Sequence, residues 1–202
     1  MADQTLWGTY KLNDPIIKGR ENLSPSDYEE VRLSVGGNTA VVGDFVTYRG
    51  EITAATPATH RDVITAVFVD ADTQAANVPQ YWCGQIIRPS TLPAPVSGED
   101  WNPDTALIDG TMVVILKRGT KNVVTRAILT DVSLDVLTGY LMMIGSVAGE
   151  VKIFTNTWTD TTPTAVQNTL AIVEMLYLIG YADSVAEDIA TSDIAVDISW
   201  AF

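Results

Sequence analysis

The stretch Val41–Ala55 constrains the fold most, because it predicts two short β-strands around a tight turn. In an extended chain the side chains of residues 45–48 alternate between two faces. Gly50 can adopt the positive φ that a hairpin turn needs. A second apolar run, Val63–Val69, follows and leads into acidic residues, which predicts a further strand.

A similar unit recurs in the C-terminal half, so that residues 41–71 and 137–186 are candidates for an internal duplication. Each unit has a strand, a Gly-Glu turn, a return strand, and a later apolar strand that ends in an acidic residue. The matched segments are residues 50–52 with 149–151 and residues 69–71 with 182–184. Runs of β-branched residues also resemble each other by chance, so the sequence leaves duplication and coincidence open.

Further strands are predicted along the chain wherever apolar and β-branched residues cluster between turn residues. They are Val31–Val35, Gly84–Arg88, Thr111–Lys117, Val123–Leu129, a strand from about residue 171 to 181, and Ile194–Trp200. In the last of these, alternation predicts one shared face for Ile194, Val196, Ile198 and Trp200. The strands at 111–117 and 123–129 are expected to form a hairpin. Short strands at fairly regular intervals, with few helices, predict a mainly β fold, either an antiparallel β-barrel or a sandwich.

Residues 1–30 differ from the rest, because their apolar residues are sparse and follow no period. They predict an extended N-terminal arm in front of a β domain at 31–202, with one helical turn that has Ser24 as N-cap and Pro25 at its first position. Such an arm either binds a partner or wraps the edge of its own barrel. Its clustered basic residues are Lys11, Lys18 and Arg20, whereas the C-terminal part of the chain is strongly acidic.

A long loop rich in proline is predicted at residues 73–110. Long loops in compact domains are usually functional or mediate interactions. This one carries Tyr81, Trp82 and Trp101, and aromatic residues are enriched at protein interfaces. The alternative is that these rings cap the bottom of the barrel.

Charge and composition exclude several classes of partner. The chain has 202 residues and a formal net charge of −13, whereas nucleic-acid binding needs clusters of Lys and Arg. The same charge disfavours anionic membranes, and no apolar run approaches the ~20 residues that span a bilayer. The first five residues lack the basic start and apolar core of a secretory signal, which predicts folding in a cytoplasm.

The sequence shows no recognisable catalytic or metal-binding motif. His60 lies near Asp62, but no nucleophile elbow or phosphate-binding glycine loop is present, and Cys83 is a lone thiol expected to be a small core residue. Residues 70–73 and 183–188 carry carboxylates that either bind Ca²⁺ or merely end strands. We therefore expect no enzyme activity and no cofactor.

The segment Val42–Thr56 resembles the small β-rich capsid decoration proteins of tailed viruses, which carry a Gly-Asp pair, an apolar strand, a glycine and a return strand. The counterparts of their later elements are Val63–Ala71, Ile179–Ala186 and Ile194–Trp200. The resemblance covers about half the chain. It implies a β-barrel that assembles as a homotrimer on the major capsid protein, on the virion surface, after assembly in the host cytoplasm. The arm and the loop at 73–110 depart from a minimal decoration protein and leave a turret or tail component open.

Partner-binding candidates come from the arm and the aromatic loop. They are Trp7, Tyr10, Lys11, Ile16, Ile17, Lys18, Arg20, Tyr81, Trp82 and Trp101. Two other classes of function stay open: a carbohydrate-binding module that uses Trp82, Trp101 or Trp158 as a stacking platform, and a barrel enzyme with carboxylate chemistry.

Overall fold

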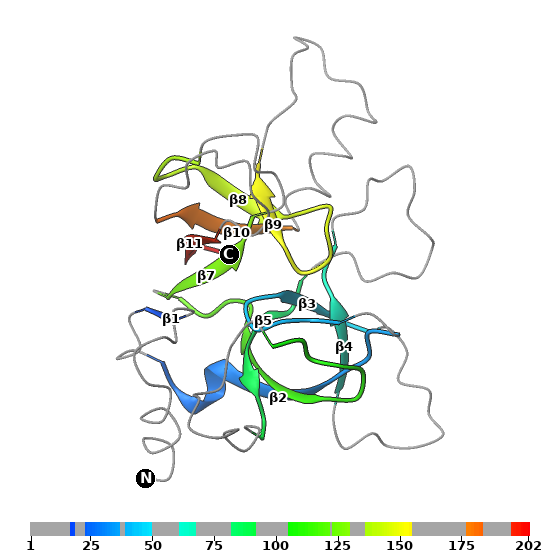
Figure 1. Ribbon diagram of the computed structural model, residues 1–202. Coiled ribbons are helices and arrows are strands. Elements are labelled where there is room, and N and C mark those ends of the chain that lie inside the picture. Colours follow the sequence, from blue (N-terminus) through cyan, green and yellow to red (C-terminus); the bar gives the residue numbers. More distant parts are fainter. Residues whose placement is uncertain are drawn as a thin grey trace, which may run out of the picture.

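Two β-sheets make up the described part of the chain, one above the other in Figure 1. The computed structural model describes residues 17–18, 23–36, 39–49, 61–67, 82–91, 105–121, 123–129, 136–154, 177–183 and 195–202. Within these ranges the secondary structure is strand, apart from the 3-10 turn η2 (Pro25–Asp27). The prediction of a mainly β fold is confirmed.

The first sheet closes into a five-stranded barrel. Its strands are β2 (Tyr28–Leu33), β3 (Phe45–Tyr48), β4 (Arg61–Thr65), β5 (Gly84–Pro89) and β6 (Met112–Lys117). Neighbours follow the order β2-β4-β3-β5-β6, and β6 pairs with β2 to close the ring. The β2–β4 pair is parallel, whereas the other pairs are antiparallel.

The second sheet has six strands in the order β1-β7-β11-β10-β8-β9. They are β1 (Ile17–Lys18), β7 (Val124–Ile128), β8 (Leu141–Ile144), β9 (Val151–Ile153), β10 (Leu178–Ala182) and β11 (Ala195–Trp200). All five pairs are antiparallel. A parallel bridge between Leu129 and Val151 also joins the end of β7 to the start of β9.

The two sheets repeat one strand topology. Starting from β2, the first runs β6, β5, β3, β4 and returns to β2 through a parallel pair. Starting from β7, the second runs β11, β10, β8, β9 and returns to β7 through the parallel Leu129–Val151 bridge. We call β2–β6 the first repeat and β7–β11 the second repeat; β1 is an extra strand on β7.

Hydrogen-bond register extends this equivalence to single residues. Gly43 and Gly139 have φ of 104° and 91° in the turns before β3 and β8. Their N–H groups donate to the carbonyls of Ile86 and Ala182, both at 2.8 Å. Gly43 and Ile86 thus have their counterparts, Gly139 and Ala182, 96 positions later in the chain. Matching registers at this level indicate an internal duplication.

A pair of glycines in β5 and β10 shows the same physical constraint in both repeats. A Cβ at Gly84 would lie 2.5 Å from the carbonyl oxygen of Leu116 in β6, and one at Gly180 would collide with that of Ser199 in β11. These glycines are also 96 residues apart. Each repeat therefore needs a residue without a side chain where these strands approach closely.

The register corrects the sequence alignment of the two repeats. Val63 of β4 and Val151 of β9 are equivalent, because each pairs in parallel with a residue at the end of the first strand of its repeat. Val63 pairs with Leu33 of β2, and Val151 pairs with Leu129 just after β7. Residues 149–151 therefore match 61–63 and not 50–52, and β10 matches β5 and not the strand after residue 61. Residues 50–52 and 69–71 lie outside the described part of the chain.

The predicted hairpin of residues 111–117 and 123–129 is wrong. β6 pairs with β2 and β5, while β7 pairs with β11 and β1. The turn at 117–120 therefore connects one repeat to the next. Both strands have apolar partners within their own repeat, and these long-range pairings override the local turn signal.

The N-terminal boundary also shifts. β2 begins at Tyr28, so residues 28–30 belong to the barrel and not to the arm. Ser24 and Pro25 occupy the predicted N-cap and first position of η2, where the Ser24 N–H donates to the Asp27 carboxylate at 2.7 Å. Residues 84–89 form the strand predicted inside the proline-rich loop.

One hydrophobic core connects the repeats. Phe45 and Trp82 of the first repeat meet Trp200 of β11, with ring centroids 5.9 and 5.1 Å from that of Trp200. Alternation places Val196, Ile198 and Trp200 inside, which confirms the face predicted for the last strand. A fully buried large side chain contributes about 1.5–3 kcal/mol, so this shared aromatic cluster fixes the repeats against each other.

Candidate functional site

Polar groups line the junction where the first repeat meets the second. Gln85 is fully buried, and its Nε2 donates to the carbonyls of Gly43 and Arg126, each at 2.7 Å. Its Oε1 has no hydrogen-bond partner among the described residues. Since Gly43 and Arg126 belong to different repeats, this amide links them, and its burial makes the link sensitive to substitution.

Asp44 and Gly149 form the closest contact of the junction. Asp44 is 6% exposed and accepts a hydrogen bond of 2.9 Å from the Val41 N–H. A Cβ at Gly149 would lie 2.5 Å from the Asp44 Cγ. Gly149 also accepts from the Phe45 N–H at 2.9 Å and donates to the Ala66 carbonyl at 2.7 Å. The second repeat thus contacts the first through the backbone of Gly149, which has no side chain.

The burial of Asp44 changes its acid–base behaviour. Desolvation, with a smaller contribution from the charge of Glu150, raises the pKa of this carboxyl to about 7, although the Val41 hydrogen bond lowers it. Burying a carboxylate without a nearby cation costs more free energy than burying the neutral acid. The ionisation of Asp44 is therefore coupled to the stability of the junction.

The second repeat exposes the face that the first repeat buries. Leu137, Tyr140 and Tyr181 lie 96 residues after Val41, Asp44 and Gln85. They are 48%, 40% and 46% exposed. We call these three residues the exposed aromatic face. Its side chains are of the kinds that bind proteins, because tyrosine is enriched at interfaces.

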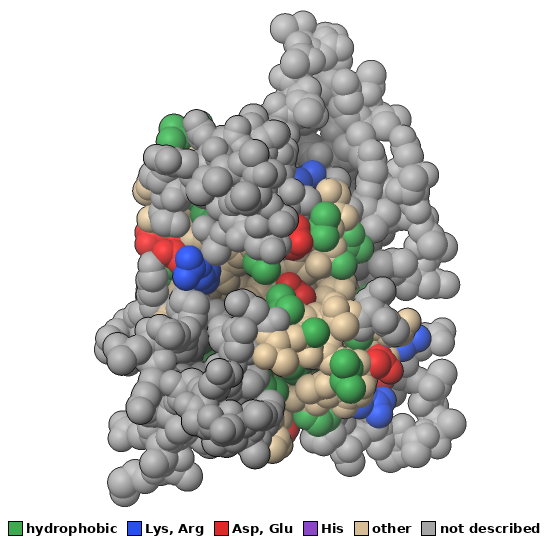
Figure 2. Space-filling view, in the orientation of Figure 1, with side chains coloured by type: hydrophobic (Ala, Val, Ile, Leu, Met, Phe, Trp, Pro, Cys, Tyr) green, Lys and Arg blue, Asp and Glu red, His purple; other side chains and the backbone are tan. Residues whose placement is uncertain are grey.

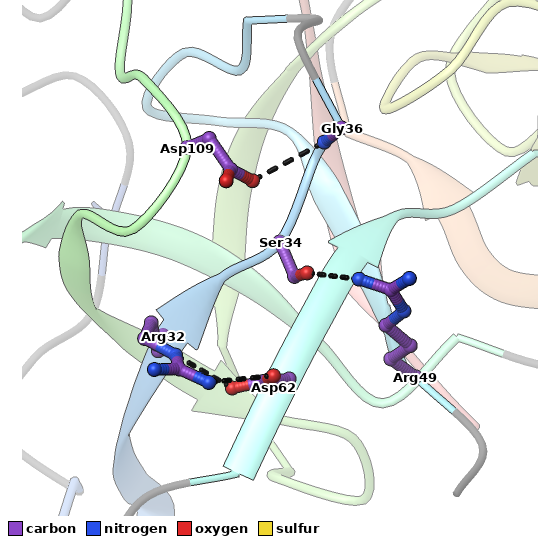
Figure 3. A network of polar contacts seen from close by, with 6 residues as sticks. All are labelled: Arg32, Ser34, Gly36, Arg49, Asp62 and Asp109. Carbon is purple, nitrogen blue, oxygen red and sulfur yellow. Dashed lines mark hydrogen bonds and ion pairs between the residues drawn. The ribbon is translucent and has the colours of Figure 1, made fainter.

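A network of charged and polar side chains covers the β2–β4 side of the first repeat (Figure 3). Arg32 reaches from β2 to Asp62 in β4 with two hydrogen bonds of 2.8 and 2.9 Å. Arg49 donates to the Ser34 hydroxyl, and the Asp109 carboxylate accepts from the Gly36 N–H at 3.2 Å. The Arg32 hydrogen bonds lower the pKa of Asp62.

A second set of contacts lies next to this network. The Tyr48 hydroxyl donates to Glu29 at 2.6 Å, and the Arg61 guanidinium lies over the Tyr48 ring, 4.9 Å from its centroid. Glu29 also approaches Arg61 at 3.7 Å. We call Glu29, Glu30, Arg32, Arg61 and Asp62 the charged belt. Figure 2 shows acidic and basic side chains side by side on the visible surface.

Replacing Asp62 with asparagine should cost less than about 1 kcal/mol of unfolding free energy. The Arg32–Asp62 pair is bidentate, but the Arg32 side chain is 51% exposed and water screens the charges. Urea denaturation at low and high salt measures the effect. A loss of several kcal/mol that salt does not reduce would show that the pair acts as a buried one.

The structure corrects two of the predicted partner-binding residues. Trp82 is fully buried, and its Nε1 donates to the Leu178 carbonyl at 2.9 Å, so it joins the repeats and offers no surface to a partner or sugar. Ile17 is buried in its own chain, because β1 lies along β7. Lys18 ends that strand. The other candidates lie outside the described residues: Trp7, Tyr10, Lys11, Ile16, Arg20, Tyr81 and Trp101.

Other candidate sites from the sequence have varied outcomes. Cys83 is buried, as expected, and desolvation raises the pKa of its thiol to about 12. His60, Trp158, and residues 70–73 and 187–188 lie outside the described residues. Within the part of the chain that the structure describes, no group of His, Cys, Asp and Glu is placed to hold a metal, and no helix is long and apolar enough to cross a membrane.

Comparison with known proteins gives no family for this chain. No protein-family model matches it, and a search of curated proteins finds no match.

Sequence reasoning missed the exposed aromatic face. Tyr140 and Tyr181 lie far apart in the sequence, and neither belongs to a motif. The signal that identifies them is the offset of 96 residues that relates β3 to β8 and β5 to β10, which emerges from the strand register. Without that register, the sequence does not show that they occupy the positions that the first repeat buries against the second.

Proposed function

We propose that this protein is a virion structural protein that decorates or cements a viral capsid by binding the major capsid protein. In this role it works as a homo-oligomer, most simply a trimer, without catalysis, cofactor or nucleic acid. The resemblance of residues 42–56 to capsid decoration proteins suggested this role, and the structure adds an argument about assembly.

The exposed aromatic face is the observation that carries the proposal. In the first repeat the equivalent surface binds another β-domain, and Asp44 and Gln85 there are buried. In the second repeat the same surface bears Tyr140 and Tyr181, which are large and half exposed. A repeat that keeps a domain-binding face with aromatic side chains suits a protein whose task is assembly.

Attachment to the capsid is assigned to the chain before β1. The backbone of β1 adds to the edge of β7, with Ile17 opposite Thr125. This strand anchors the N-terminal segment to the second repeat, and residues 1–15 precede it with Trp7, Tyr10 and Lys11. Many copies on a lattice bind strongly even when each contact is weak.

The test is binding of the recombinant protein to virus particles from which this chain has been removed. We expect the full chain to co-sediment with the particles, and mass spectrometry of untreated particles to detect it. A variant that lacks residues 1–15 keeps β1 and Ile17 in the core. It should stay folded, but its occupancy on the particles should fall roughly tenfold or more, because the lost affinity of each copy is multiplied over the lattice.

Matched measurements make the result decisive. Circular dichroism and thermal unfolding of the truncated variant separate loss of binding from loss of fold. Unchanged occupancy and salt resistance would show that residues 1–15 are not the anchor. Failure of the full chain to bind particles, together with specific binding on a glycan array, would replace this proposal with a carbohydrate-binding function.

A further inference from the structure

We propose that copies of this protein join head to tail, with the exposed aromatic face of one copy bound to the charged belt of the next. This inference rests on the homo-oligomer in the proposed function and identifies the surfaces that form it. It follows from how the two repeats bind each other within one chain.

The contact inside the chain joins two unlike surfaces. The first repeat contributes the face around Asp44 and Gln85. The second repeat contributes the Arg126 carbonyl in β7 and Gly149 in the turn before β9. A contact between unlike surfaces of equivalent units is heterologous, and such contacts can continue from one unit to the next.

Both halves of this contact recur at exposed positions. The second repeat carries Tyr140 and Tyr181 where the first has Asp44 and Gln85. By strand register, Glu30 of β2 matches Arg126, and Arg61 of β4 matches Gly149. Glu30 and Arg61 are both exposed. Among the described residues, one copy therefore exposes a counterpart of each half of the internal contact.

The chemistry at these positions is complementary. The equivalence brings Arg61 of one copy to Tyr140 of the next, and Glu30 to Tyr181. The chain already contains both kinds of contact, because Arg61 lies over the Tyr48 ring and the Tyr48 hydroxyl donates to Glu29. Arginine and tyrosine dominate the energetic centres of many interfaces.

The contact between copies differs in its spacing from the contact inside the chain, because Arg61 takes the place of Gly149. Gly149 lets the second repeat approach Asp44 through backbone, whereas Arg61 requires more space. The contact between copies is therefore wider and made by side chains, so it can form and dissociate without unfolding either repeat. Closure of such a contact after three copies gives the proposed trimer.

Site-directed cross-linking tests the arrangement in the full-length protein. One variant carries Arg61→Cys and another carries Tyr140→Cys; the two are mixed and treated with a short bis-maleimide. We expect dimers that contain one copy of each variant, and little product from either variant alone. Cys83 is buried with a raised thiol pKa, so the unsubstituted protein should not react and serves as the blank.

A double variant measures how many copies the assembly contains. A chain with both Arg61→Cys and Tyr140→Cys should give a ladder of cross-linked products that stops at the closed ring, expected at three copies. The control replaces Tyr140→Cys with Lys121→Cys, an exposed position in the turn between the repeats. Combined with Arg61→Cys, it should give no ladder.

The outcomes separate this proposal from the one on which it rests. An oligomer that cross-links through Tyr140→Cys alone, but not to Arg61→Cys, would show a symmetric contact and overturn the head-to-tail arrangement only. A monomer at all concentrations in sedimentation would overturn both the arrangement and the proposed oligomer. Particle binding, measured independently, decides the virion function in either case.

Discussion

Gly149→Ala is expected to destabilise the protein by roughly 2–5 kcal/mol. Two costs combine at this position. Gly149 has φ of 87°, where a residue with a side chain is strained. The added Cβ would also lie 2.5 Å from the Cγ of Asp44 in the other repeat. Thermal and urea unfolding measure the loss.

Gly139→Ala is the matched control. Gly139 has φ of 91°, close to that of Gly149, but a Cβ there would meet nothing within 4 Å. It should cost only the backbone strain of about 1–2 kcal/mol. Equal losses in the two variants would show that the Asp44 contact does not hold the repeats together.

Asp44→Asn should stabilise the protein at neutral and alkaline pH, by up to roughly 4 kcal/mol, since one pKa unit corresponds to about 1.4 kcal/mol. Asparagine keeps an oxygen for the Val41 N–H but carries no charge. Desolvation holds the pKa of Asp44 at about 7 in the folded state, against 3.8 as its ordinary value. The charged form is thus disfavoured in the folded protein.

The direction of the pH dependence follows from this difference. Between pH 3.8 and about 7 the folded state binds the Asp44 proton and the unfolded state does not. The stabilisation from the neutral acid is therefore complete below pH 3.8 and is lost as the pH rises to about 7, with no further change above it.

Urea unfolding of both proteins from pH 4 to pH 8 measures this effect. The variant should match the unsubstituted protein near pH 4 and exceed it increasingly toward pH 7. A constant difference across this range would mean that Asp44 keeps an ordinary pKa at the junction. Asp183→Asn, at an exposed position of the second repeat, controls for a general effect of net charge.

The chemistry of single strands could be predicted from the sequence. Alternation placed Val196, Ile198 and Trp200 on one buried face, as observed. The β-branched residues of 84–88 and 111–117 also predict strands, which the structure has at Gly84–Pro89 and Met112–Lys117. These predictions succeed because the alternation of apolar and polar side chains along a strand is a property of residues that are close in the sequence.

Strand partners were not predictable in the same way. The turn after Lys117 resembles a hairpin turn, yet it connects the two repeats. The duplication was suggested by the Gly-Glu pairs, but the true equivalence pairs Gly43 with Gly139 and Gly84 with Gly180. Those glycines are recognisable as a set only after the strands are placed, because their shared role is contact with carbonyls distant in the sequence.

The side-chain period and the turn residues act over a few positions, so the amino-acid order alone predicts short β-strands with an apolar interior. The folded chain adds that these strands form two equivalent repeats, that Trp82 is internal, and that Tyr140 and Tyr181 stay exposed where Asp44 and Gln85 are buried. The physical reason is that burial and desolvation at the junction depend on which surfaces meet, and those surfaces are assembled from residues far apart in the chain.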